Sequence, residues 1–387
     1  MRGAGVAKEV RKASREMERL LHPVERLRVA TPYSSKPDTS FWRRSVLRNQ
    51  ANALDPVIAT AFTFSSNEAI ATAGSCFAQH ISRALRDHDF NYMVTEDSPM
   101  TSAADNENFG VFPARFGNIY SVRQLSQLMR RAYGLFYPVD EAWIRDDGRY
   151  IDPFRPLVQT AGFDSANAVM EDREAHLGAV RTMFEECDVF IFTLGLTERW
   201  QSAQDGAVFP VVPQSVANVS GFDEYVFENA TVWEMNHDLR EFIERLCIVN
   251  PAVKIILTVS PVPLIATYEA NHVLVSNAYS KAALRVVAEE AVRAFSNVAY
   301  FPSYEIITAP HLTANYFGDD LREIRPAGVD HALTIFLRHF TSKTHLASVP
   351  AVSPSVHAVS ENASVEEALM RKAQGVICDE EIIEVTH

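Results

Sequence analysis

Long apolar runs and cysteines are scarce in this sequence of 387 residues. The longest apolar runs, such as 189–196, stop far short of the roughly 20 residues that a membrane-spanning helix needs, so we expect no membrane span. The four cysteines lie at separations that fit neither a zinc site nor a dense disulfide framework. We therefore expect reduced thiols and no bound metal.

Basic residues are fewer than acidic residues. Lys and Arg number 36 against 49 Asp and Glu, a net charge of −13 that works against binding to phosphate backbones, so we expect no nucleic-acid partner. The first 21 residues interleave charges and lack the apolar segment of a secretory signal, which favours a cytoplasmic location. Hydrophobic residues, in contrast, make up 47% of the chain, enough for a globular core.

The composition changes along the chain and predicts three parts. Residues 1–31 have the spacing of a basic amphipathic helix, and the Pro- and Ser-rich stretch 31–46 is typical of an extended arm that wraps onto the body. Residues 32–344 are expected to form an α/β domain. Residues 345–387 lose periodicity and become acidic, which predicts a flexible tail.

Short apolar runs alternate with amphipathic stretches in the middle of the chain. Unbroken apolar runs are typical of strands that are buried on both faces, and their alternation with helices predicts a mainly parallel sheet covered on both sides. We expect strands at 69–74, 187–195, 253–263 and 298–307, and helices at 77–87, 121–134, 238–250 and 280–295. Segments 135–175 and 201–236 break this rhythm and are expected to form irregular cap insertions.

The turn Gly74-Ser75-Cys76 is the first candidate site, because it lies where the first strand gives way to a helix. It lacks the glycines of a dinucleotide or phosphate loop, so we expect no cofactor. It offers a hydroxyl and a thiol at a helix N-terminus, where backbone N–H groups stabilise anions. The alternative is a small-residue turn in which Ser75 only caps the helix.

A second candidate is the loop that contains Gly117 and Asn118, just before the helix at 121–134. A glycine N–H and an asparagine amide are the two donor types that an oxyanion hole uses. The alternative is an ordinary Gly-Asn turn.

Several blocks together resemble the GSCFA family. They include the string Gly-Ser-Cys-Phe-Ala at 74–78, and also FWRRSV at 41–46, FGNIYS at 116–121, TLGLTERW at 193–200, SPVPL at 260–264, NAYSKAALR at 277–285 and YFPSYEII at 300–307. The resemblance covers about residues 32 to 340. The family in turn resembles the SGNH or GDSL esterases and acyltransferases, which implies a flavodoxin-like three-layer sandwich with a nucleophile after the first strand and a late histidine.

The esterase resemblance leaves two candidates for the nucleophile. Alignment on Gly74 places Cys76 at the nucleophile position, whereas alignment on the serine selects Ser75. We favour Cys76, because the strand-to-helix turn fixes the offset from the glycine better than residue type does. The competing interpretation of Cys76 is a small buried hydrophobic residue.

The block at 193–200 resembles the Gly-x-Asn-Asp block of those esterases. It implies that Gly195, Thr197 and Glu198 contribute to the oxyanion or substrate site. Threonine cannot donate as an amide does, so the oxyanion role passes to Asn118. The alternative for Glu198 is an ion pair with Arg199.

The resemblance implies that His331 is the general base. Esterases carry an aspartate three residues earlier, where this chain has Gly328, while Asp330 adjoins the histidine directly. An adjacent aspartate rarely orients its neighbour's ring, so we expect either a nucleophile–histidine dyad or a carbonyl that holds the imidazole. His80, four residues after Cys76, is the other candidate for tuning the thiol.

The sequence thus predicts an acyl-ester hydrolase or O-acyltransferase that acts on an acylated glycan or a small ester by a nucleophile–histidine mechanism. The other class of protein that it allows is a catalytically degenerate SGNH-like scaffold that binds glycan or acyl ligands. The sequence leaves the oligomeric state open.

Overall fold

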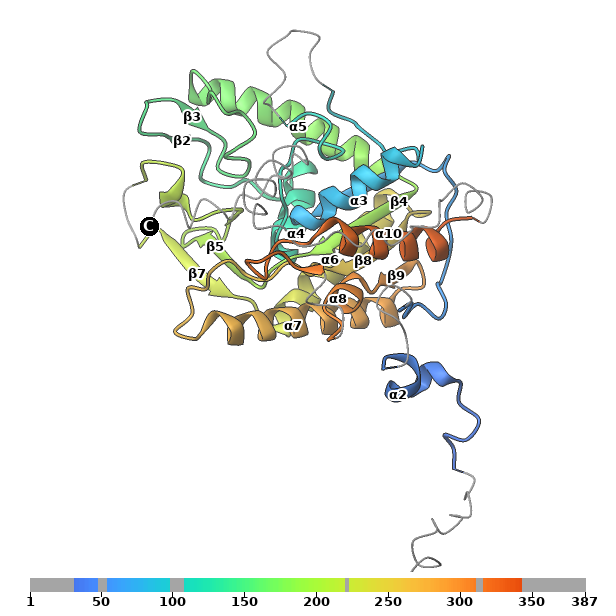
Figure 1. Cartoon of the computed structure of the whole chain (residues 1–387). Helices are drawn as coiled ribbons and strands as arrows, with labels where there is room; N and C mark the ends of the chain where they lie inside the picture. Colours follow the sequence, from blue (N-terminus) through green and yellow to red (C-terminus); the bar gives the residue numbers. More distant parts are fainter. Residues whose placement is uncertain (1–30, 48–53, 98–107, 220–222, 311–315, 343–387) are drawn as a thin grey trace, which may run out of the picture. The chain divides into compact units, whose positions relative to one another are not determined.

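The computed structural model describes residues 31–47, 54–97, 108–219, 223–310 and 316–342 (Figure 1). The chain forms two compact units, Met1–Leu54 and Asp55–His387. In the first unit a 3₁₀ turn, η1 (Asp38–Ser40), is followed by the one-turn helix α2 (Trp42–Ser45). The stretch expected to be an extended arm thus contains two short helical turns, and the N–H groups of Arg44 and Ser45 both donate to the carbonyl of Phe41. The predicted helix at 1–31 and tail at 345–387 lie outside the described residues.

Four parallel strands form the central sheet of the second unit, in the order β1-β4-β8-β9. They are β1 (Ile70–Gly74), β4 (Val189–Leu194), β8 (Lys254–Val259) and β9 (Val298–Phe301). Tyr92 adds a parallel bridge on the outer edge of β1, opposite Ile70. If this bridge is counted as the second strand of the chain, the strand order becomes 2-1-3-4-5, which is the order of a flavodoxin-like sheet. In such sheets ligands bind between the first and third strands, which here are β1 and β4.

Helices cover both faces of this sheet, which confirms the three-layer α/β prediction. One face carries α3 (Cys76–Asp87), α8 (Ser303–Ile307) and α10 (Pro326–Phe340), and Figure 1 shows α3 and α10 in front of the strands. The other face carries α4 (Val122–Ala132), α5 (Ala166–Glu186), α6 (Val232–Val249) and α7 (Val273–Ala294). These four helices and the strands bury one continuous apolar core.

The two segments expected to be irregular contain regular structure. The first segment contains the hairpin β2 (Trp143–Ile144) and β3 (Tyr150–Ile151). The second contains β6 (Val208–Phe209), the 3₁₀ turn η4 (Pro213–Ser215) and β7 (Tyr225–Asn229). Strands β6 and β7 pair antiparallel with β5 (Glu198–Ser202), which begins just before that segment. Helices α5 and α6 also begin inside these segments. An aromatic cluster explains the order, since Trp143, Phe209 and Tyr225 pack ring against ring.

A buried network of ion pairs joins the segment around Asp152 to helix α5. Asp152 is fully buried and accepts hydrogen bonds from Arg155 Nε at 2.9 Å and Arg173 Nη2 at 2.6 Å. Burial alone would raise the pKa of Asp152, but the two arginines hold it far below its ordinary value. Glu96 and the buried His176 pair at 2.7 Å beside this network.

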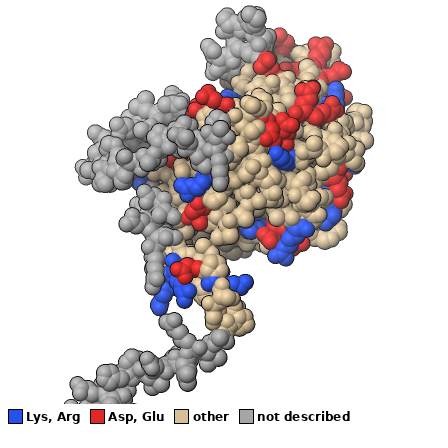
Figure 2. Space-filling view, turned by 90° about the vertical axis from the view of Figure 1, so that its right-hand side faces the viewer, with Lys and Arg blue, Asp and Glu red and all other residues tan. Residues whose placement is uncertain are grey.

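The face in Figure 2 shows Lys and Arg interspersed with Asp and Glu on a largely uncharged surface. None of the helices within the described ranges is long and apolar enough to cross a membrane.

Candidate active site

The turn after β1 requires glycine at position 74. Gly74 has φ +143°, and a Cβ there would lie 2.5 Å from the carbonyl oxygen of Thr193 on β4. A side chain would therefore push β1 and β4 apart. Ser75 follows in an extended conformation and α3 begins at Cys76.

Ser75 lies between the carboxyl ends of β1 and β4. Its side chain is 4% exposed, and a Cβ on Gly195 would approach Ser75 Cβ to 3.1 Å. The side chain makes no capping bond to α3, and within the described residues Oγ has no hydrogen-bond partner. Buried hydroxyls in native proteins are normally paired, so this one is a candidate for contact with a ligand.

Two further buried hydroxyls near this edge lack partners among the described residues, those of Thr193 and Thr197. Thr193 pairs with Gly74 across the sheet, and Thr197 lies two residues beyond Gly195. The carboxyl edge between β1 and β4 therefore concentrates unsatisfied polar groups at the place where this fold binds ligands.

Cys76 is the first helical residue of α3 and is a free thiol, 6% exposed. His80, one turn later, packs its ring 5.9 Å from that of Phe77. Burial and the charge of Arg83 lower the pKa of His80 to about 4, so it is neutral at pH 7.

The Gly117–Asn118 loop adjoins the same turn, because the N–H of Ile119 donates to the carbonyl of Gly74 at 2.8 Å. Asn118 is buried, and its Oδ1 accepts from Gln79 of α3 at 3.0 Å. Gly117 has φ +70°, and its N–H has no partner among the described residues. The predicted donors thus lie beside the turn that carries Ser75 and Cys76.

The loop after β4 is held from two sides. The N–H groups of Gly195 and Leu196 both donate to the carbonyl of Tyr120, so the Gly195 N–H is not available as an oxyanion donor. Lys281, 1% exposed, donates from Nζ to the carbonyl of Gly195 at 2.9 Å. Gly195 instead contributes the space that the Ser75 side chain needs.

Glu198 stabilises a neighbouring loop. Its carboxylate accepts from the hydroxyl of Thr267 at 2.6 Å and the N–H of Tyr268 at 3.3 Å, and burial raises its pKa. Arg199 pairs with Glu228 at 3.0 Å, so the alternative of a Glu198–Arg199 ion pair is wrong. The two side chains alternate along β5 and point to opposite faces of its sheet.

His331 lies in the first turns of α10. The C-terminal half of that helix is anchored to the sheet, since Phe336 packs on Phe301 at the end of β9 and the carbonyl of Phe340 accepts from Phe64 N–H. His331, nearer the helix N-terminus, therefore lies toward the carboxyl ends of the strands. Helix α10 also packs against α3, which carries Cys76.

A tyrosine holds the imidazole of His331. Tyr316 Oη lies 2.7 Å from His331 Nδ1, and a Cβ on Gly328 would come within 2.9 Å of Tyr316 Cβ. A side chain at position 328 would collide with this tyrosine. Asp330 is exposed and makes no hydrogen bond to His331 in the described part of the chain. No sequence motif pointed to Tyr316.

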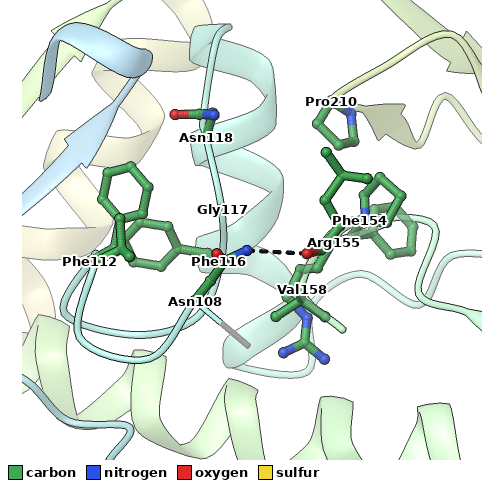
Figure 3. A pocket seen from close by; sticks show the side chains of 12 residues that line it. Asn108, Phe112, Phe116, Gly117, Asn118, Phe154, Arg155, Val158 and Pro210 are labelled. Carbon is green, nitrogen blue, oxygen red and sulfur yellow. Dashed lines mark hydrogen bonds between the residues drawn. The ribbon is translucent and has the colours of Figure 1, made fainter. Parts of the chain in front are cut away.

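A pocket opens over the Gly117–Asn118 loop (Figure 3). Most of its lining is apolar, and its space, open mouth included, is about 400 Å³. The side-chain amide of Asn108 donates to the carbonyl of Leu157 at 3.1 Å, and this hydrogen bond connects two segments that line the pocket. Its lining residues are Asn108, Val111, Phe112, Phe116, Gly117, Asn118, Phe154, Arg155, Pro156, Leu157, Val158 and Pro210.

Fold and site together define a three-layer α/β protein with a buried serine hydroxyl at the carboxyl edge of its sheet, and this hydroxyl has no hydrogen-bond partner among the described residues. The chain belongs to the GSCFA family, whose model matches residues 69–336. No curated protein and no solved structure matches it.

Proposed function

We propose that this protein is an acyl-ester hydrolase or O-acyltransferase of the SGNH type, acting on an acylated glycan or a small ester, with Ser75 as the nucleophile. The observation that carries the proposal is the buried Ser75 hydroxyl between β1 and β4, which has no hydrogen-bond partner in the described part of the chain. Cys76 remains the second candidate. We prefer Ser75 because its side chain abuts Gly195 on the neighbouring strand end, whereas Cys76 is already part of the helix.

In the proposed reaction Ser75 Oγ attacks the carbonyl carbon of the ester, and its proton passes to Nε2 of His331. The Gly117 N–H, the Asn118 amide and the N–H groups in the first turn of α3 donate to the oxyanion. Collapse of the tetrahedral intermediate breaks the ester C–O bond, and His331 returns the proton to the leaving alcohol. Water then hydrolyses the acyl-serine, or an acceptor hydroxyl takes the acyl group.

The hydrogen bond between Tyr316 and His331 determines which imidazole nitrogen of His331 can accept the proton of Ser75. For Nε2 to act as base, Nδ1 must carry the hydrogen and donate to Tyr316 Oη. Burial raises the pKa of Tyr316, so the phenol stays neutral and supplies no negative charge to the imidazolium. We therefore expect a weaker base than in a triad with a carboxylate, and slow turnover.

The test is ester turnover by matched variants of the full chain. Ser75→Ala should lower kcat/KM for a short-chain p-nitrophenyl ester by roughly 10³-fold or more, while Cys76→Ala should retain most activity. The reverse ranking would transfer the nucleophile role to Cys76. Full activity in both variants would refute the covalent mechanism.

A second candidate function is that of a scaffold that binds a glycan or acyl ligand without chemistry. The glycine at 328 and the neutral Tyr316 favour it, because they remove the carboxylate that supports a catalytic histidine. Ligand binding by a wild-type protein that turns over no ester or thioester would select this function.

A further inference from the structure

The pocket in Figure 3 has apolar walls on two sides. Phe112 and Phe116 line one side, and Phe154, Val158 and Pro210 line the other. Apolar and aromatic walls of this kind bind the hydrocarbon part of a ligand.

Among the described lining residues the only charged one is Arg155, whose charge is balanced by two carboxylates although its Nη1 has no hydrogen-bond partner there. Nε donates to Asp152 at 2.9 Å and Nη2 to Asp172 at 2.7 Å. Figure 3 shows the guanidinium at the end of the pocket away from Asn118. Because Asp152 and Asp172 already neutralise this guanidinium, the pocket favours an uncharged group over an anionic one.

One end of the pocket reaches the proposed oxyanion donors. Gly117 lines it, and a Cβ at that position would meet no atom within 4 Å, so the space above Gly117 is open. Two residues later Ile119 bonds to the carbonyl of Gly74, immediately before Ser75. The pocket therefore adjoins the loop that contacts the nucleophile turn.

We propose that this pocket binds the acyl group of the substrate, and that it selects a compact, uncharged, apolar acyl group such as butyryl or benzoyl. The inference rests on the proposed function. The enclosed cavity volume is only about 20 Å³, which argues against long chains.

The test compares acyl groups on one leaving group. Val158, 3% exposed, lines the pocket, and Val139, 54% exposed in the same insertion, is a control for added bulk. Val158→Phe should lower kcat/KM for the p-nitrophenyl butyrate at least tenfold more than for the acetate, and Val158→Ala should shift preference toward the benzoate. Val139→Phe should leave all ratios unchanged. A hemisuccinyl ester should be a poorer substrate than the butyrate for the wild type.

Unchanged acyl ratios in folded Val158→Phe and Val158→Ala proteins would overturn the pocket assignment while leaving the Ser75 mechanism intact. Calorimetric titration with butyramide separates the two proposals, because it needs no turnover. Ser75→Ala should still bind butyramide, and Val158→Phe should bind at least tenfold more weakly. Binding with this dependence in a protein that turns over no ester would retain the pocket and reject the proposed enzyme. Absence of butyramide binding to Ser75→Ala and wild type would reject the pocket.

Discussion

Replacement of Asp152 by asparagine should cost a large part of the protein's stability. The carboxylate accepts four hydrogen bonds: Oδ1 from Phe154 N–H and Arg173 Nη2, and Oδ2 from Arg155 Nε and Arg173 Nε. Asparagine can keep the first pair but presents an NH₂ group to the second. It also leaves the charges of Arg155 and Arg173 without their shared partner.

Two lost charge-assisted bonds at about 1.5–3 kcal/mol each give roughly 3–6 kcal/mol, and removal of one member of a buried ion pair typically costs about 3–5 kcal/mol. We therefore expect Asp152→Asn to lower the free energy of unfolding by about 4 kcal/mol, measured by urea denaturation. The control is Asp164→Asn, which removes the exposed partner of Arg149 and should leave the urea midpoint nearly unchanged. A loss below about 1 kcal/mol for Asp152→Asn would refute the assigned role of the network.

Three further outcomes follow from the same structure. Gly74→Ala should lower the free energy of unfolding by about 3 kcal/mol or more, because the added methyl group would collide with Thr193. Gly206 also has a positive φ, +72°, but has open space around it, so Gly206→Ala should lower the free energy of unfolding by only about 1 kcal/mol. Thermal unfolding of the two variants measures the difference. The free energy of unfolding should fall by about 3 kcal/mol between pH 6.5 and 4, because burial lowers the pKa of His176 to about 4 and only the unfolded state binds a proton at this residue in that range. Urea titrations at several pH values should show this fall in the wild type and a smaller one in His176→Gln. Equal pH dependence in the two proteins would contradict the prediction. Tyr316→Phe should lower kcat about tenfold with KM unchanged and alter the pH profile of kcat, and an unchanged profile would remove Tyr316 as the group that orients His331.

The core of the fold was predictable because its signals are local. The unbroken apolar runs at β4 and β8 predict buried parallel strands, and glycine at 74 marks the close approach of β1 to β4. The insertion strands were missed because they are two to five residues long and are ordered by partners distant in sequence, as in the pairing of Trp200 with Phe209 and Phe227.

The sequence indicated which segments meet near the turn after β1, but not the contacts that their side chains make there. Sequence alone could not distinguish Ser75 from Cys76, because the distinction depends on which side chain meets Gly195 across the sheet. The bond from Tyr316 to His331 has no motif, since it depends on how Gly328 packs against the tyrosine ring. The bond from Lys281 to the Gly195 carbonyl joins residues 86 positions apart and leaves no local signal.

The most direct test of the account is covalent trapping of the nucleophile. The wild-type protein is incubated with a fluorophosphonate, and the modified residue is located by peptide mass spectrometry, with Ser75→Ala, Cys76→Ala and His331→Gln as comparisons. The account predicts a single adduct on Ser75 that persists in Cys76→Ala, is absent from Ser75→Ala and forms much more slowly in His331→Gln. A protein that hydrolyses esters while Ser75 stays unmodified, or that is labelled equally fast without His331, would contradict it.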